Sequence, residues 1–268
     1  MPTSHRSRTG LHWLEDGPGA DAPAVVLIHG LGGDAQFWSV EQAALAARFR
    51  VLAVDMRGSG LSPGCVDGVC IDDLARDVES ILDEAGIASA HVVGFSMGGV
   101  VTQALACTAP HRVERLVLAA TFARTLPQAQ LFLQAIGSAY RETICGKQLY
   151  QLVLPWLFSE NFLADPRAIP YLSYPEEQGD EPSREDWLRL LDAMLAFDGR
   201  PRLHDIRVPT LIISGDEDRL APLAGAQELA AGIAGSALAI VAGGHLMNVE
   251  SPEAFIRQIE QFLSPPRA

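Results

Sequence analysis

Six short apolar runs, rich in β-branched residues, constrain the fold of this chain more than any other feature. They occupy residues 24–29, 50–55, 90–95, 115–120, 209–214 and 237–242. Each run is continuously apolar, as expected of strands buried on both faces of a parallel sheet. Helical patterns lie between them, at 39–47, 72–85, 97–108, 222–232 and 252–263. This alternation predicts an α/β fold with a mostly parallel central sheet flanked by helices.

The alternation breaks once, between residues 122 and 205. This stretch is helical in pattern and rich in large apolar residues, with tryptophan at 156 and 187. We interpret it as a helical cap inserted over the carboxyl edge of the sheet. The core would then comprise residues 1–121 and 206–268. No linker divides the 268 residues into independent domains.

The net charge of −13 bears on the partners of the chain. An acidic surface repels phosphate backbones and anionic lipids, so nucleic acid and membranes are poor partners, although a small anionic substrate stays open. No apolar run reaches the roughly 18 residues of a membrane span, and the amino terminus lacks a signal-peptide pattern. We therefore expect a soluble cytoplasmic protein. The sequence does not predict its oligomeric state.

Four cysteines in a chain of this length do not form a disulfide framework. Cys65 and Cys70 share one loop, where a local bridge is conceivable, but reduced thiols are the preferred interpretation. No second ligand pair or nearby histidine supports a metal site at these cysteines. We expect no metal in this protein.

Ser96 stands in the segment Gly94-Phe95-Ser96-Met97-Gly98, directly after a strand pattern and before a helical one. This context is typical of a nucleophile elbow, in which a tight strand–turn–helix projects the serine hydroxyl from the sheet. Side chains at 94 and 98 would collide with the neighbouring strand and helix. The helix amino end adds partial positive charge at the same place. Ser96 is the candidate nucleophile.

A serine hydroxyl needs a base, and His245 is the best candidate among seven histidines. It follows the 237–242 strand and a Gly-Gly turn, at the strand end where α/β enzymes place their site. Asp218, after the 209–214 strand, is the preferred acid, with Asp216 as the second choice. The order Ser96, Asp218, His245 differs from both classical protease orders.

Two backbone donors should stabilise a developing oxyanion. The Met97 N–H follows the nucleophile, and the Leu31 N–H lies in the glycine-rich segment "HGLGG" after the first strand. Candidate pocket residues are Phe37, Trp38, Phe95, Trp156 and Met194, although apolar residues at such positions are more often core. Arg124 could anchor a substrate carboxylate, but we prefer surface solvation for it.

With these motifs the chain resembles the α/β-hydrolase superfamily over essentially its whole length. The matching stretches are "HGLGG", "DMRGSGLS", "GFSMGG", "SGDEDRLAP" and "GGHLMNVESPEAF". The overall pattern is similar to the enol-lactonase and carboxylesterase branch, with aminoacrylate hydrolase-like relatives nearby. The resemblance implies a cap that shapes the pocket and no metal or organic cofactor. A serine at the elbow disfavours haloalkane dehalogenase and epoxide hydrolase chemistry.

The resemblance implies two-step acyl transfer on a small ester or lactone through an acyl-enzyme. Carbon–carbon bond hydrolases, hydroxynitrile lyases and cofactor-free perhydrolases share the triad, so they stay open. A ligand receptor that retains the triad is an alternative from a different class, and turnover separates it from an enzyme. The physiological substrate, the pathway, acyl-chain preference and cap motion are not predicted.

Overall fold

A computed structural model describes residues 1–174 and 183–264 of the chain. It contains one sheet in the order β1-β2-β4-β3-β5-β6-β7-β8. The two edge pairings β1–β2 and β2–β4 are antiparallel, and the pairings from β4 to β8 are parallel. The strands are β1 (Thr3–Arg6), β2 (His12–Asp16), β3 (Ala24–Ile28), β4 (Arg50–Val54), β5 (Ala90–Phe95), β6 (Val113–Ala119), β7 (Thr210–Gly215) and β8 (Ala237–Val241).

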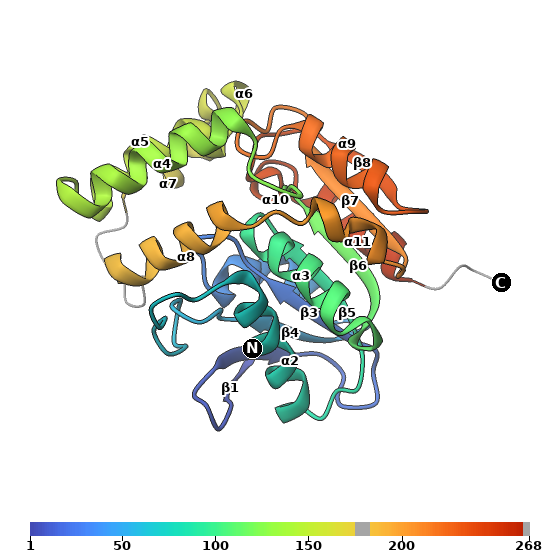
Figure 1. The fold of residues 1–268 in the computed structure, drawn as a ribbon. Coiled ribbons are helices and arrows are strands. Elements are labelled where there is room, and N and C mark those ends of the chain that lie inside the picture. Colours follow the sequence, from blue (N-terminus) through green and yellow to red (C-terminus); the bar gives the residue numbers. More distant parts are fainter. Residues whose placement is uncertain (175–182, 265–268) are drawn as a thin grey trace.

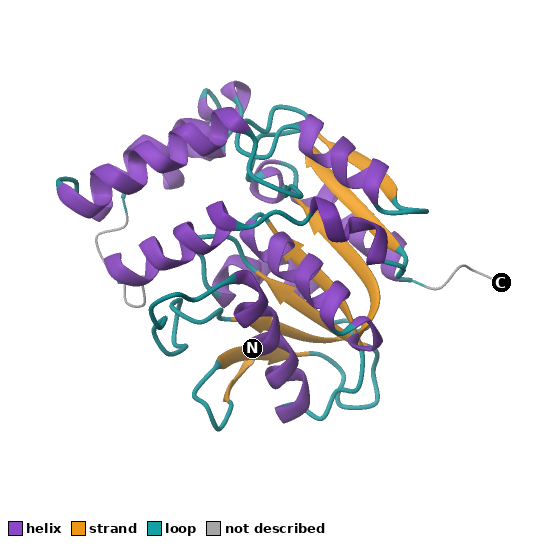
Figure 2. Cartoon of the chain, viewed as in Figure 1, coloured by secondary structure: helices purple, strands orange, loops and turns teal. Residues whose placement is uncertain are grey.

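Helices cover both faces of this sheet (Figure 2). Apolar side chains of α2, α3 and α9 pack on one face with Val26 and Ile28 of β3. Those of α1 and α11 pack on the other face with Val25 and Leu27. The helices outside the 122–205 segment are α1 (Ser39–Leu45), α2 (Ile71–Glu84), α3 (Met97–Thr108), α9 (Leu223–Gly232), α10 (Met247–Glu250) and α11 (Pro252–Leu263).

The predicted α/β architecture is confirmed, and the six apolar runs coincide with β3 to β8. The sequence analysis did not predict β1 and β2. The residues of β1 are polar, and β2 has only the two apolar residues Trp13 and Leu14 between polar ones, so neither forms a continuous apolar run. The two strands pair with each other at one edge of the sheet. The prediction that every run is buried on both faces is wrong for β8. This strand lies at the other edge, where Leu238 and Ile240 are exposed.

Five α-helices, with loops and short 3-10 helices between them, make up the described part of the segment between β6 and β7. Figure 1 shows α4 to α7 together at one side of the molecule, on the opposite side from β1 and α2. The predicted cap boundaries at 122 and 205 stay a prediction, and its residues 175–182 lie outside the described residues. The helices are α4 (Pro127–Glu142), α5 (Gly146–Leu157), α6 (Glu160–Leu163), α7 (Ile169–Leu172) and α8 (Arg184–Ala196). No helix in the described part of the chain combines the length and apolarity that a bilayer crossing requires.

Glu250, at the end of α10, fastens this helical segment to the loop that carries His245. Its buried carboxylate accepts hydrogen bonds from the Gly244 N–H and the Ser159 N–H, both at 2.9 Å, and from the Ser159 hydroxyl. The Leu246 N–H also donates to the Leu157 carbonyl at 2.8 Å. Buried donors such as these need an acceptor, so Glu250 holds the two segments together.

A second buried carboxyl joins α1 to α10. Glu41 is 1% exposed, and its Oε1 accepts from the Asn248 amide at 3.3 Å. Burial raises the pKa of Glu41 to about 7. The Asn248 Oδ1 atom is buried without a partner among the described residues. A protonated Glu41 carboxyl has an O–H group that can donate a hydrogen bond to Asn248 Oδ1.

We predict that Glu250→Ala lowers the free energy of unfolding by about 3 kcal/mol, because three buried donors lose their acceptor. Glu250→Gln should lose less, since its amide oxygen still accepts. Urea denaturation measures both. Glu253→Ala, at an exposed position in the first turn of α11, is the matched control and should cost less than about 1 kcal/mol. Equal losses at 250 and 253 would contradict this account.

Glu41 should make the stability of the protein fall as the pH rises. Its folded pKa of about 7 lies above its ordinary value of 4.5. The folded state therefore binds the proton of Glu41 more tightly than the unfolded state does. The stability that this proton contributes is lost as the pH rises from about 4.5 to 7. We expect Glu41→Gln to gain stability over wild type by on the order of 3 kcal/mol at pH 8 but not at pH 4. Urea denaturation at both pH values tests this, and a gain that is the same at both would refute it.

Candidate active site

Ser96 is held at the junction of β5 and α3 in a backbone conformation that is rare for a residue with a side chain. Its φ is +53°. The Ser96 N–H donates to the Ala119 carbonyl at 2.9 Å, and the Thr121 hydroxyl donates to the Ser96 carbonyl at 2.7 Å. Such backbone strain persists only where the surroundings impose it.

The glycines on either side of Ser96 make this turn sterically feasible. A Cβ at Gly98 would lie 2.1 Å from the Ile28 carbonyl oxygen of β3. A Cβ at Gly94 would lie 2.4 Å from the Gly98 carbonyl oxygen. The expected collisions with strand and helix are therefore confirmed. Helix α3 approaches the sheet closely only because these side chains are absent.

Three side chains from separate strand ends meet at this turn. His245 Nε2 lies 3.0 Å from Ser96 Oγ, and His245 Nδ1 lies 2.9 Å from Asp218 Oδ2. All three residues are buried. Because an ionised carboxylate only accepts hydrogen bonds, Nδ1 then carries the proton and Nε2 can accept from the Ser96 hydroxyl. The arrangement has the geometry of a nucleophile, a base and an orienting acid.

The two aspartates of the β7–α9 loop have different partners. The Oδ1 atom of Asp218 accepts from the Leu220 and Ala221 N–H groups at 2.9 and 2.8 Å, which leaves Oδ2 for His245. Asp216 instead accepts from the Gly243 N–H at 2.8 Å. The structure thus places Asp218, and not Asp216, beside the histidine.

Leu31, in the loop after β3, lines the cavity that lies beside Ser96 and His245. His29 is fully buried; its Nε2 accepts from the Met56 N–H at 3.2 Å, so its Nδ1–H donates to the Gly30 carbonyl at 2.7 Å. Burial lowers the pKa of His29, which favours this neutral form. Neither Leu31 nor Met97 has an acceptor for its N–H among the described residues. The predicted oxyanion role of these two N–H groups stays a prediction.

Asp55 connects the loop after β3 to β2 and to the loop after β4. The sequence analysis did not predict this role. It is buried; its Oδ1 accepts from the Ala35 N–H at 2.6 Å, and its Oδ2 accepts from the Leu61 N–H at 2.8 Å. The same Oδ2 lies 2.6 Å from Nδ1 of His12. In the sequence, Asp55 stands at the end of a strand and begins the matching stretch "DMRGSGLS", but neither signal revealed these partners.

A cavity of about 300 Å³ opens beside Ser96 and His245. Phe37, Phe95 and Met194 line it. Residues of α4, α5 and α8 that were not predicted complete its walls: Leu133, Ile136, Tyr140, Gly146, Leu149, Tyr150, Val153, Leu157 and Trp187. Their helical spacing was visible in the sequence, but the same spacing is expected of an ordinary core.

Two of the predicted pocket residues lie elsewhere. Trp38 has no exposed surface, and its ring stacks on Phe255 of α11, in the core on the α1 and α11 face of the sheet. Trp156 stacks on Phe132 of α4, with ring centres 4.1 Å apart. Both predictions are wrong because another aromatic ring covers each indole. Arg124 is also absent from the cavity lining.

The described residues contain no group of three His, Cys, Asp or Glu side chains that could hold a metal ion. Cys65 and Cys70 are free thiols.

Comparison with known proteins places the chain in a family. The pattern of the family described as "Alpha/beta hydrolase family" matches residues 25–258. A protein of Azorhizobium caulinodans named "Putative carbamate hydrolase RutD" is 33% identical over 95% of each chain. The "3-oxoadipate enol-lactonase 2" of Acinetobacter baylyi is 33% identical over 90% of this chain and 88% of its own.

A solved structure of similar shape leads to the same family. The crystal structure of the enol-lactonase from Burkholderia xenovorans is 31% identical and superimposes with a TM-score of 0.86, covering 98% of this chain and 100% of the other. Sequence and structure thus agree over nearly the full length, and the chain belongs to the α/β-hydrolase family and is a hydrolase.

Proposed function

We propose that this hydrolase cleaves a carboxylic ester or lactone through an acyl-enzyme on Ser96. The observation that carries the proposal is the continuous contact from Asp218 through His245 to Ser96, at 2.9 and 3.0 Å, on the wall of an apolar cavity. An activated serine beside unpaired N–H groups suits acyl transfer. The names of the enol-lactonase relatives are consistent with it.

In the proposed first step, His245 Nε2 takes the proton of the Ser96 hydroxyl while Oγ attacks the substrate carbonyl carbon. The N–H groups of Leu31 and Met97 donate to the oxyanion. His245 then gives the proton to the leaving oxygen, the C–O bond breaks, and the acyl group stays on Ser96. Asp218 stabilises the charged imidazole and fixes its tautomer.

The second step releases the acid. His245 takes a proton from a water molecule, the hydroxide attacks the acyl carbon, and the proton returns to Ser96 Oγ as its ester bond breaks. We propose that the helices of residues 122–205 act as the cap that walls the pocket. The proposed partner is a small molecule. The mechanism calls for no metal or cofactor.

A carbamate is the second candidate substrate. The relative named "Putative carbamate hydrolase RutD" favours it, and a carbamate carbonyl can be attacked by the same serine. Aminoacrylate-type and carbon–carbon bond hydrolysis use the same constellation, and a ligand receptor is the alternative without steady turnover. Hydrolysis rates of aryl esters and aryl carbamates that share one leaving group distinguish the ester from the carbamate as substrate.

We predict that Ser96→Ala lowers kcat for p-nitrophenyl butyrate by roughly 10⁵–10⁶-fold, as in serine hydrolases whose nucleophile is removed. Wild type should turn over repeatedly at about 1–10³ per second. Steady-state release of p-nitrophenol measures both, and matching thermal unfolding curves control for folding. Wild-type protein as slow as the variant would contradict the proposal and favour the receptor.

The two aspartates provide a matched pair of variants. Asp218→Asn should lower kcat by roughly 10⁴-fold, because the amide no longer favours the required tautomer of His245. Asp216→Asn keeps an oxygen that accepts from the Gly243 N–H, so it should change kcat by less than about tenfold. The same ester assay compares them. A larger loss at 216 than at 218 would overturn the assignment of the acid.

A further inference from the structure

The cavity beside Ser96 is lined without a charged residue. Among the described residues that form its walls there is no lysine, arginine, aspartate or glutamate. His245 is there, together with three tyrosines and Trp187 as neutral hydrogen-bonding groups. The remaining side chains are aliphatic or phenylalanine, apart from Ser96, and the other positions are glycines. The described walls therefore offer no lysine or arginine that could form an ion pair with a substrate carboxylate.

Arg184 contacts the wall residue Tyr140, but its guanidinium interacts with groups outside the cavity lining. The Arg184 guanidinium stacks over the ring of Tyr140 at 4.9 Å and donates to the Ile144 carbonyl at 3.2 Å. Arg184 is exposed and is not part of the lining. Residues 175–182, which follow Tyr174 in the chain, contain four acidic residues and no lysine or arginine. They therefore have no cation to offer a substrate.

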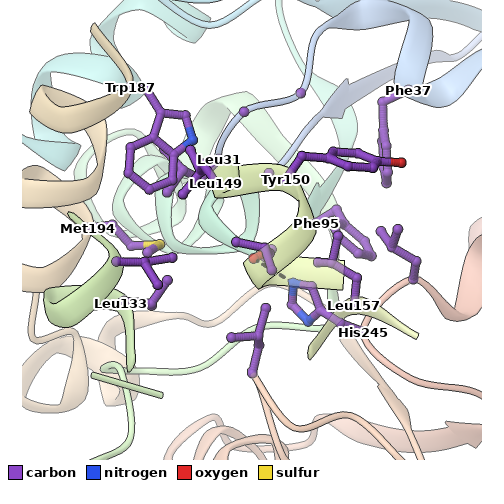
Figure 3. A pocket seen from close by; sticks show the side chains of 18 of the residues that line it. Leu31, Phe37, Phe95, Leu133, Leu149, Tyr150, Leu157, Trp187, Met194 and His245 are labelled. Carbon is purple, nitrogen blue, oxygen red and sulfur yellow. Dashed lines mark hydrogen bonds between the residues drawn. The ribbon is translucent and has the colours of Figure 1, made fainter. Parts of the chain in front are cut away.

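The apolar walls extend to both sides of the catalytic histidine. In Figure 3, Trp187, Met194 and Leu133 lie on one side of His245, and Phe37 and Leu157 lie on the other. The first group comes from α4 and α8, and the second from the short 3-10 helix Ala35–Trp38 that follows β3 and from the end of α5. An ester has an acyl half and an alcohol half on either side of its carbonyl. Each half must rest against one of these walls.

We propose that the substrate is uncharged in both its acyl and its alcohol half, so that this site selects neutral apolar esters or lactones and rejects those that carry a carboxylate. The inference rests on the proposed function, since it assumes acyl transfer to Ser96. A carboxylate that enters such a cavity loses its water without gaining a lysine or arginine partner, which is costly. The acidic surface of the chain adds to that discrimination.

The test compares three p-nitrophenyl esters that differ at the far end of the acyl chain. The pentanoate ends in a methyl group, the monoglutarate ends in a carboxylate, and the methyl glutarate has the same skeleton with its charge blocked. We expect kcat/KM for the monoglutarate to be lower than for the pentanoate by about a hundredfold or more. The methyl glutarate should lie within about tenfold of the pentanoate, because size alone is tolerated.

A second pair tests the alcohol half. The esters 4-methylphenyl acetate and 4-acetoxybenzoate differ in the charge of the leaving group. The acetoxybenzoate should again be the poorer substrate by about a hundredfold. Rates measured with Ser96→Ala are subtracted throughout, because the glutarate carboxylate can attack its own ester.

Substitution of Met194 by lysine should weaken the preference for an uncharged acyl chain. Met194→Lys places an ammonium on the α8 wall, and Met194→Gln is a neutral side chain of similar length. We expect the lysine variant to raise the ratio of monoglutarate to pentanoate kcat/KM by at least about tenfold, and the glutamine variant to leave it unchanged. Thermal unfolding checks that both variants fold.

The possible results separate this inference from the proposed function. If wild type and Ser96→Ala are equally inert toward the pentanoate, acyl transfer to Ser96 fails, and the selectivity falls with it. If the pentanoate and the monoglutarate are both cleaved in a Ser96-dependent way with similar kcat/KM, the proposed function stands and the neutral-substrate inference is overturned. Should the methyl glutarate be as poor as the monoglutarate, size rather than charge decides, which also overturns it.

Discussion

The close approach of helix α3 to strands β3 and β5 is the constraint on which the rest of the site depends. Gly94 and Gly98 leave no space for side chains, since a Cβ at either position would lie within 2.4 Å of a carbonyl oxygen. That contact forces Ser96 into a left-handed backbone conformation. The same geometry sets the amino end of α3, and with it the free Met97 N–H, next to the hydroxyl. If α3 packed less closely on the sheet, Ser96 would lose its orientation, and the Met97 N–H would lose its place beside the hydroxyl.

Buried hydrogen bonds fix the positions of the other loops around the site. Asp55 links the loop after β3 to β2 and to the loop after β4, and His29 holds the Gly30 carbonyl. Glu250 connects the His245 loop to Ser159 in the helical segment. The carboxylates of Asp55 and Glu250 each bind groups from segments that are far apart in the sequence. Removal of the acceptor would leave those donors unsatisfied, so the loops are held by the cost of separating them.

The apolar cavity explains how a common arrangement of residues can be selective. The polar groups at Ser96, His245 and Asp218 suit acyl transfer in general. The walls that decide which molecule enters come from α4, α5 and α8, whose residues line the space above Ser96. Other wall residues, such as Phe37 and Phe95, lie in the same part of the chain as the reacting groups. The walls formed by α4, α5 and α8 come from a separate segment, so they can change while the triad geometry is kept.

The sequence by itself determined the alternation of strands and helices and the strand ends at which Ser96, Asp218 and His245 stand, because these follow from local periodicity and glycine placement. It missed β1 and β2, which lack a continuous apolar run and form strands through pairing with each other at the sheet edge. It also could not distinguish Phe37, which lines the cavity, from Trp38, which stacks on Phe255. Both are large aromatics in one short helix. Only the tertiary structure decides which of them faces the cavity, because that depends on what packs against each ring from a distant part of the chain.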